Sequence, residues 1–293
     1  MAQDGTPLLR ISQNICPTAV PEKQMDFGIN YSTQAASLLA AGAVQVDRFK
    51  TPDWPDMILE AQSFCPVSVH FEMRAGNGTL AKTDWQRIQG ILEQTGTPFV
   101  NLHLDPRIKH FPDFQIDTTD PYESRRILDQ IIEDLNTAAQ YFEPERIIGE
   151  NVPYRGWDDK SLRPAVVPKN IRHILDETGC GLLLDISHAR ISARYLGMDE
   201  CDYMNQLPVE KLRELHFTGV HRIGNRLQDH LEALEPDWEI LDWVLERISC
   251  GDWPRPWLFV FEYGGVGEKF EGRSETPLIA EQVPRLYELI KKI

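Results

Sequence analysis

Cysteine is scarce in this chain, and its spacing argues against two kinds of site. The five cysteines occur without CxxC or CxxxC spacing, and their number is odd: Cys16, Cys65, Cys180, Cys201 and Cys250. Neither a disulfide framework nor a thiolate zinc site is therefore indicated. We expect the protein to work in a reducing compartment.

Long apolar runs and an excess of positive charge are also missing. No stretch approaches the ~18 apolar residues of a membrane span, and the start, MAQDGTPLLR, lacks the basic and then apolar pattern of a signal peptide. The 45 acidic residues outnumber the 30 basic ones, and the net charge of −15 repels phosphate backbones and anionic membranes. We therefore expect a cytoplasmic protein that binds neither membrane nor nucleic acid.

What the chain does contain is a repeated alternation of short apolar runs with longer segments of helical spacing. Helical spacing is clearest at 122–141, 236–248 and 281–290. The alternation occurs eight times, with candidate strands at 26–31, 44–49, 67–71, 99–104, 146–151, 181–186, 212–217 and 258–263. Eight such units predict a parallel sheet closed into a single (β/α)8 barrel.

No composition break divides the chain into further domains. We predict an irregular segment over residues 1–24 and one barrel domain over 25–293. Two insertions, at 106–121 and 154–168, leave from the end of the strands where barrel enzymes build their sites.

Ionisable residues stand where the predicted strands end. In a parallel barrel these ends open on one face, so the side chains converge on one pocket. Imidazole and carboxylate ligands without cysteine suit iron, manganese, zinc or cobalt in a catalytic centre. The residues are His70, His103, Glu150, Asp185, His188, His216 and Glu262, followed after the seventh strand by His221, Asp229 and His230.

A single histidine on a strand is more often a packed core residue than a metal ligand. Six of the eight histidines, however, fall at predicted strand ends or in the next loop. Carboxylates buried side by side repel each other and lose their hydration, and a bound cation removes both costs. We therefore predict a site for two or more divalent metal ions. For Asp47 and Lys50, an ion pair at the barrel rim and a contact with substrate are both open.

One segment, LLLDISHARISA at 182–193, resembles the sixth-strand motif of the multinuclear non-haem iron-dependent oxidative enzymes. VSVHF, GENV and ELHFTGVH followed by QDH agree with it. That family is part of the xylose isomerase-like barrels, which also include endonuclease IV and the sugar phosphate isomerases and epimerases. The resemblance covers most of the chain from about Asp26. It implies a set of metal ligands at His70, His103, Glu150, Asp185, His188, His216, His230 and Glu262.

The resemblance leaves one ligand position open. Related enzymes carry Asp-x-His after the seventh strand, whereas this chain has Gln228, Asp229 and His230. Either Gln228 replaces the carboxylate, or a shift of one residue brings Asp229 to the metal.

Four functions are compatible with these residues. The first is a redox enzyme with two or more metal ions, iron favoured over zinc or manganese, that uses O2 to oxidise a small molecule or a peptide cysteine. The second is a sugar isomerase or epimerase with one divalent ion and with Glu150 and Glu262 as catalytic carboxylates. The third, phosphodiester hydrolysis as in endonuclease IV, conflicts with the acidic charge. The fourth is a barrel that has lost its metals and only binds a partner.

Overall fold

The computed structural model describes residues 24–156, 160–267 and 273–293, so the segment predicted to be irregular lies almost wholly outside the described residues. Its centre is a parallel sheet in the order β3-β2-β1-β11-β8-β7-β6-β5-β4, and β9 and β10 form a separate antiparallel hairpin. The strands are β1 (Asp26–Asn30), β2 (Arg48–Pro52), β3 (Val67–His70), β4 (Arg74–Ala75), β5 (Val100–Leu104), β6 (Ile147–Glu150), β7 (Gly181–Asp185), β8 (Leu212–Phe217), β9 (Gly219–Ile223), β10 (Arg226–Leu231) and β11 (Leu258–Phe261).

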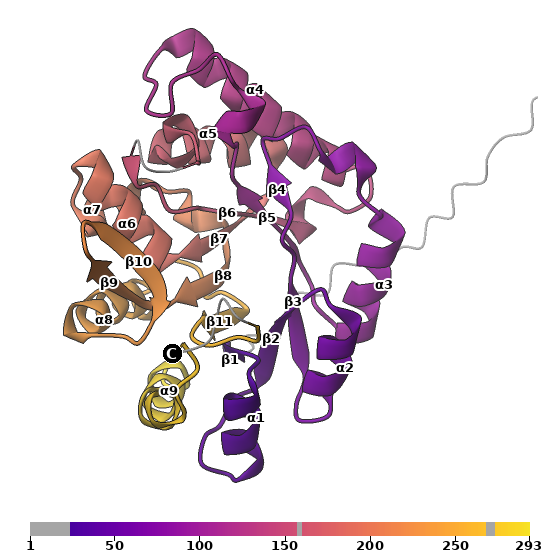
Figure 1. The fold of residues 1–293 in the computed structure, drawn as a ribbon, viewed down its shortest axis with the longest axis vertical. Helices are drawn as coiled ribbons and strands as arrows, with labels where there is room; N and C mark the ends of the chain where they lie inside the picture. The colour runs from indigo at the N-terminus through magenta and orange to yellow at the C-terminus, as the bar shows by residue number, and fades with distance from the viewer. Residues whose placement is uncertain (1–23, 157–159, 268–272) are drawn as a thin grey trace, which may run out of the picture.

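Helices surround the outer side of this sheet (Figure 1). The α-helices are α1 (Thr33–Ala40), α2 (Pro55–Gln62), α3 (Trp85–Thr95), α4 (Pro121–Ala138), α5 (Pro168–Thr178), α6 (Ile186–Leu196), α7 (Glu200–Gln206), α8 (Glu235–Ser249) and α9 (Thr276–Ile290). Short 3-10 turns occur in the connections: η1 (Leu80–Lys82), η2 (Ile108–His110), η3 (Pro144–Arg146), η5 (Arg163–Val166) and η6 (Val209–Lys211).

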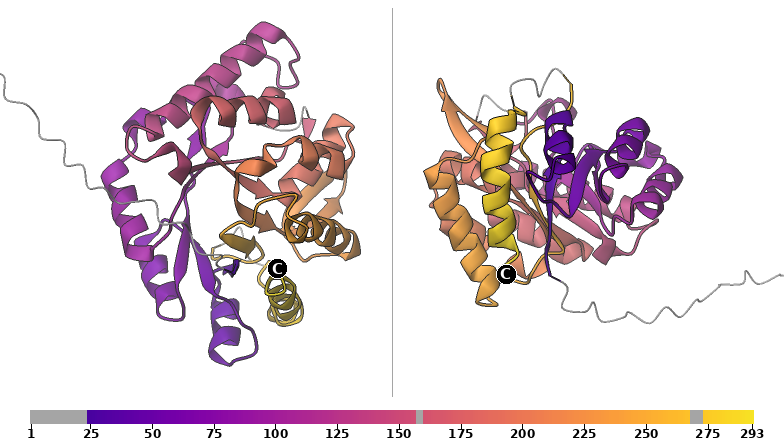
Figure 2. Two further views of the ribbon diagram at one scale, coloured as in Figure 1. Left: turned by 180° about the vertical axis from the view of Figure 1, so that it is seen from behind. Right: turned by 90° about the horizontal axis from the view of Figure 1, so that it is seen from below.

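The sheet curls so that its two ends approach each other. Its end strands, β3 and β4, belong to one short segment of chain and are separated only by residues 71–73. The first and last strands, β1 and β11, pair in parallel, and the last helix, α9, lies beside the first, α1 (Figure 2). The arrangement is barrel-like, as the alternation of strands and helices predicted.

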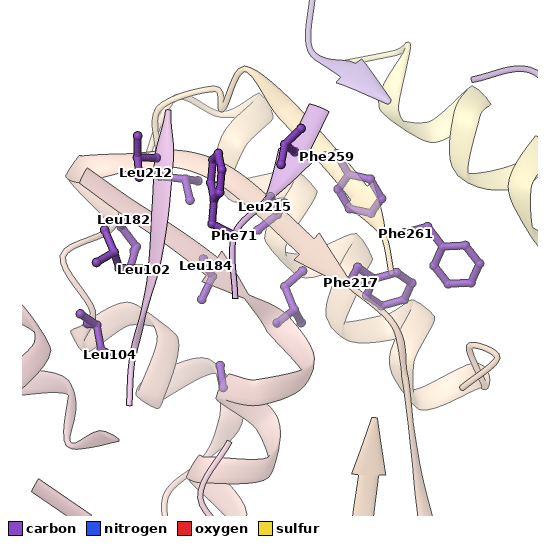
Figure 3. Close-up of a cluster of buried hydrophobic side chains, with 14 of the residues drawn as sticks. Phe71, Leu102, Leu104, Leu182, Leu184, Leu212, Leu215, Phe217, Phe259 and Phe261 are labelled. Atoms are coloured by element: carbon purple, nitrogen blue, oxygen red, sulfur yellow. The ribbon is translucent and has the colours of Figure 1, made fainter. Parts of the chain in front are cut away.

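Alternating side chains divide the strands into two layers. Outward residues form the core with the helices, and Figure 3 shows leucines of β5, β7 and β8 with phenylalanines of β8 and β11. The ring of Phe217 lies 6.1 Å from both Phe259 and Phe261, measured between centroids. The inward residues include most of the predicted ligands. The same alternation therefore places apolar side chains in the core and points the predicted ligands towards one another inside the sheet.

Two predicted starts differ from the structure by four and five residues. The second strand begins at Arg48, not at residue 44, because Asp47 turns the chain into the sheet: its Oδ2 atom accepts a hydrogen bond from the Phe27 backbone N–H at 2.6 Å. The last helix begins at Thr276, five residues before the predicted start, and continues through Pro284. Val44 and Val46 therefore belong to the connection that precedes β2.

The two predicted insertions contact each other. Arg107 and Ser161 form an antiparallel bridge, and the Ile108 backbone N–H donates to Lys160 O at 3.0 Å. Residues 157–159, within the second insertion, lie outside the described residues. The contact fixes both segments beside the carboxyl ends of β4 and β5.

Candidate metal centre

Strand register brings the inward side chains into one layer. His103 on β5 pairs in register with Glu150 on β6, and Asp185 on β7 pairs with His216 on β8. On β11, Val260 pairs with His216, so Glu262 follows two residues later on the same side. Residues from distant parts of the sequence thus meet at the carboxyl ends of adjacent strands.

The first group of potential ligands consists of His70, His103 and Glu150, whose ligand atoms lie within 4.8 Å of one another. Glu150 Oε2 lies 3.5 Å from His70 Nε2 and 3.4 Å from His103 Nε2. Within the described part of the chain, this oxygen is buried and accepts no hydrogen bond. A buried carboxylate oxygen without a donor is costly, and a cation between it and the two imidazoles would remove that cost.

The second set of contacts centres on His216, which is fully buried. His216 groups with Glu150 and Asp185 on one side and with His70 and Glu262 on the other. Its Nδ1 atom lies 2.9 Å from Glu262 Oε1. Because Glu150 and His70 belong to two groups each, the first and second sets form one continuous cluster.

The third group consists of His188, Asp229 and His230. His188 comes from the first turn of α6, where the Asp185 side chain caps the helix by accepting from the His188 backbone N–H at 2.8 Å. Asp229 and His230 come from the hairpin, at an irregularity in register between Gln228 and Leu231. His230 has φ of 58°, an unfavourable value for a residue with a side chain, which is typical of functional sites.

Backbone carbonyls hold three of these imidazoles. A carbonyl oxygen can only accept, so each contacting Nδ1 atom carries a proton and each Nε2 atom keeps its lone pair in the neutral ring. Ligand histidines in metalloproteins are oriented by this kind of outer hydrogen bond. The pairs are His103 with Met73 O at 3.0 Å, His188 with Asn151 O at 2.9 Å and His230 with Glu262 O at 3.0 Å.

His216 is held instead by side chains. Its Nε2 atom lies 2.8 Å from Glu214 Oε1 and 2.8 Å from Lys50 Nζ, and Lys50 also pairs with Glu214. Trp257 Nε1 donates to the other Glu214 oxygen at 3.1 Å. Lys50 and Glu214 are both buried, and neither was among the predicted ligands.

The pKa values of the histidines differ within the cluster, according to the charged groups beside each ring. Burial lowers the pKa of His188, yet the carboxylates of Asp185 and Asp229 outweigh burial and raise it to about 10. Glu262 and Glu214 likewise outweigh burial at His216 and raise its pKa to about 9. Burial and the charge of Lys50 hold the pKa of His70 well below its ordinary value. At neutral pH both of these imidazoles, His188 and His216, are therefore doubly protonated. A bound cation would displace one of the two protons from each ring.

The cluster opens into a cavity of about 830 Å³, within the usual range for ligand pockets. His70, His103, His188 and His230 line it, and Arg74, Arg155, Arg226 and Arg273 contribute positive charge to its walls. Arg155 also contacts Asp229, with 3.4 Å between Nη2 and Oδ2. The arrangement can hold cations at its floor and can bind polar groups of a substrate above them.

The structure thus brings together all nine predicted metal-site residues. It places Asp229 Oδ2, not the Gln228 side chain, beside His188, at 3.3 Å from Nε2. His221 turns away and contacts Glu232 O at 2.8 Å. The suggested ion pair at the barrel rim is wrong for Asp47 and Lys50, because Asp47 pairs with Lys291 and Lys50 lies inside the cluster.

Solved structures of a sugar epimerase and of an endonuclease share this parallel, barrel-like fold. A D-psicose 3-epimerase crystallised in the presence of D-fructose has a TM-score of 0.56 and 10% identity, with 92% of this chain and 99% of that chain covered. A family 2 AP endonuclease from Brucella melitensis has a TM-score of 0.52 and 13% identity, with 85% and 96% covered. At these identities the likeness concerns the fold alone.

Residues 54–254 match the family described as RiPP precursor modification enzyme MbnB/TglH/ChrH, and the chain belongs to this family. A UPF0276 protein from Acaryochloris marina is 31% identical over 121 residues, which is 40% of this chain and 43% of that relative. The match thus spans less than half of the relative's length. These findings confirm the family resemblance inferred from the sequence motifs. Across the described residues, no helix is both long and apolar enough to span a membrane.

Proposed function

We propose that this protein oxidises a side chain of a peptide substrate with two or more metal ions, of which iron is the ion we favour. The ions would lie at the carboxyl ends of the strands of a closed (β/α)8 barrel. Membership of a family of RiPP precursor modification enzymes supports a peptide substrate. The three adjoining groups of histidines and carboxylates support more than one ion.

The observation that carries the proposal is the outer hydrogen bonding of the imidazoles. His103, His188 and His230 each use Nδ1 on a backbone carbonyl, and their Nε2 atoms remain for a cation. Histidines that serve only to pack the core would not all need Nδ1 bound to a backbone carbonyl. Here the same arrangement recurs in three histidines from different elements. The unsatisfied Glu150 Oε2 atom fits a cation at the first group.

The residues divide the work of the site. His70, His103 and Glu150 would hold one ion, and His188, Asp229 and His230 another. His216 would hold a further ion, either with His70 and Glu262 or with Glu150 and Asp185. When bound, iron would provide affinity for O2 and a route by which electrons from the oxidised substrate reach O2, which no side chain provides. Of these ligands, Glu150 and Glu262 would also be the carboxylates that take a proton from a bound substrate, and the arginines of the cavity wall would orient polar substrate groups.

The third group favours this reading over a sugar isomerase. An isomerase needs one divalent ion that chelates substrate oxygens and a pair of carboxylates that exchange a proton. His188, Asp229 and His230 are surplus to that reaction, yet they lie within ligand distance of one another.

The test is the metal content of protein purified without chelator or added metal. We expect two or more equivalents of iron per chain, with a loss in both Asp185→Ala and His188→Ala. His221→Ala is the matched control, since His221 lies in the same hairpin region and turns away from the cluster. One equivalent of manganese, magnesium or zinc would favour isomerisation, and no metal in any preparation would contradict the proposal.

A further inference from the structure

A second pocket, of about 790 Å³, adjoins the metal cavity. The two share Glu72 and Arg74 as lining residues, so a substrate that extends from the metal groups across these residues enters the second pocket. We call it the basic pocket, after the cationic residues that line it: Arg74, Arg107, Lys109 and Lys160.

The charge of the basic pocket is opposite to that of the molecule. The chain carries a net charge of −15, yet the described lining of this pocket has four Lys and Arg residues and one acid, Glu72. A second acid, Asp105, is buried beneath two of the arginines. Cations concentrated at one place on an acidic protein attract a negatively charged ligand there and leave the rest of the surface repulsive to it.

The two arginines are held in place before any ligand arrives. Asp105 Oδ2 lies 2.9 Å from Arg74 Nε and 2.5 Å from Arg107 Nη2, and Asp105 Oδ1 accepts from Ser161 Oγ at 2.6 Å. Arg74 Nη2 also lies 3.5 Å from Glu72 Oε2. A guanidinium has five N–H donors, so these carboxylates leave donors on both arginines for a ligand. Preorganised donors lose less entropy on binding than mobile ones.

Backbone contacts add to this rigidity. Asn77 accepts from the Arg107 backbone N–H at 3.0 Å and donates to Asp105 O at 3.1 Å. The bridge between Arg107 and Ser161 joins the two insertions that were recognised in the sequence. The two insertions therefore supply Arg107, Lys109 and Lys160 to the pocket, while Arg74 comes from β4.

We propose that the basic pocket binds an acidic segment of the peptide substrate while a neighbouring side chain of that peptide reaches the metal groups. The inference rests on the proposed function for the peptide, and on the pocket's own charge for its acidity. Aspartate and glutamate side chains match the guanidinium donors, and the adjoining cavities fit a chain-like ligand.

The test uses the full-length protein and a fluorescently labelled hexaglutamate peptide, with binding followed by anisotropy and hexaglutamine as the neutral comparison. Arg107→Gln/Lys109→Gln removes two charges from the basic pocket. Arg125→Gln/Lys169→Gln removes two exposed charges elsewhere and is the matched control. We expect about a tenfold loss of hexaglutamate affinity in the first variant and less than about twofold in the control.

Equal losses in the two double variants, or no saturable binding by the wild-type protein, would overturn the proposal. Lys109→Glu keeps the Arg107 contacts with Asp105 and tests the pocket should the double variant fold poorly. Metal content, measured on the same preparations, separates the two proposals. If the protein contains no metal but still binds hexaglutamate through these residues, only the proposed metal centre is contradicted. If the protein contains metal but does not bind hexaglutamate, only the basic pocket is contradicted.

Discussion

The Oε1 atom of Glu214 lies 2.8 Å from the Nε2 atom of His216, two residues further along β8. Both side chains are buried, and Lys50 contacts both. A carboxylate at Nε2 stabilises a proton there and leaves Nδ1 for a cation on the side of Glu262. Glu214 is therefore a positioning residue for His216.

Glu214→Gln is expected to weaken metal binding by roughly 10- to 100-fold, because the amide keeps the shape of the carboxylate but loses its charge. Competition with a chelator measures the dissociation constant. Glu210→Gln, at an exposed carboxylate, is the control and should leave it unchanged. Lys50→Met/Glu214→Gln removes both charges, so no buried lysine is left unpaired. If this double variant bound metal like the wild type, the role of Glu214 would be wrong.

Asp229→Ala is expected to lose about one metal equivalent, because Asp229 Oδ2 lies 3.3 Å from His188 Nε2 in the third group. Gln228→Ala, at the preceding residue of the same hairpin, should keep the full metal content. Elemental analysis of both variants compares them directly. The opposite result would assign the ligand position to Gln228.

Metal binding is expected to release about two protons at pH 7, because His188 and His216 have pKa values of about 10 and about 9 in the metal-free protein. A ligand imidazole must give up its proton, so affinity rises with pH from about 6 towards the pKa of His216. Titration calorimetry in two buffers with different ionisation enthalpies counts the protons. A binding enthalpy that does not depend on the buffer would contradict this prediction.

Asp237→Ala is expected to lower the free energy of unfolding by about 3 kcal/mol. Asp237 is buried and pairs with Arg190 of α6, and it accepts from the backbone N–H groups of Val220 at 3.1 Å and Leu234 at 2.7 Å. Denaturant unfolding of Asp242→Ala, an exposed acid on the same helix, provides the comparison. Equal values for the two variants would show that the Arg190 pair adds nothing.

The alternation of residues along the strands is why so much of the site was predictable. VSVH, VNLH and FVFE each place apolar residues towards the helices and an ionisable residue inward. Glu214 carried the same signal, two residues before His216, and was overlooked as part of the strand. The pattern at 44–49 predicts the second strand four residues too early and leaves Lys50 beyond its end, so it gives no sign that Lys50 contacts His216 and Glu214.

The hairpin was missed for a different reason. Its polar residues do not alternate with apolar ones, so the pattern predicts a loop there. The signal that could have found it is Gly224 followed by Asn225, a two-residue turn between β9 and β10 in which Gly224 has φ of 61°. The position of Asp229 depends on the register shift near His230, which no short pattern specifies.

The hairpin also bears on how such a protein could change its reaction. Six of the nine candidate ligands belong to strands of the parallel sheet or directly follow one, whereas Asp229 and His230 lie on a ribbon outside it. Shortening that ribbon would remove Asp229 and His230 from the third group of potential ligands and leave the other groups in place. The number of metal ions that such a site could hold can thus change by evolution of the hairpin alone, while the strands of the parallel sheet stay the same.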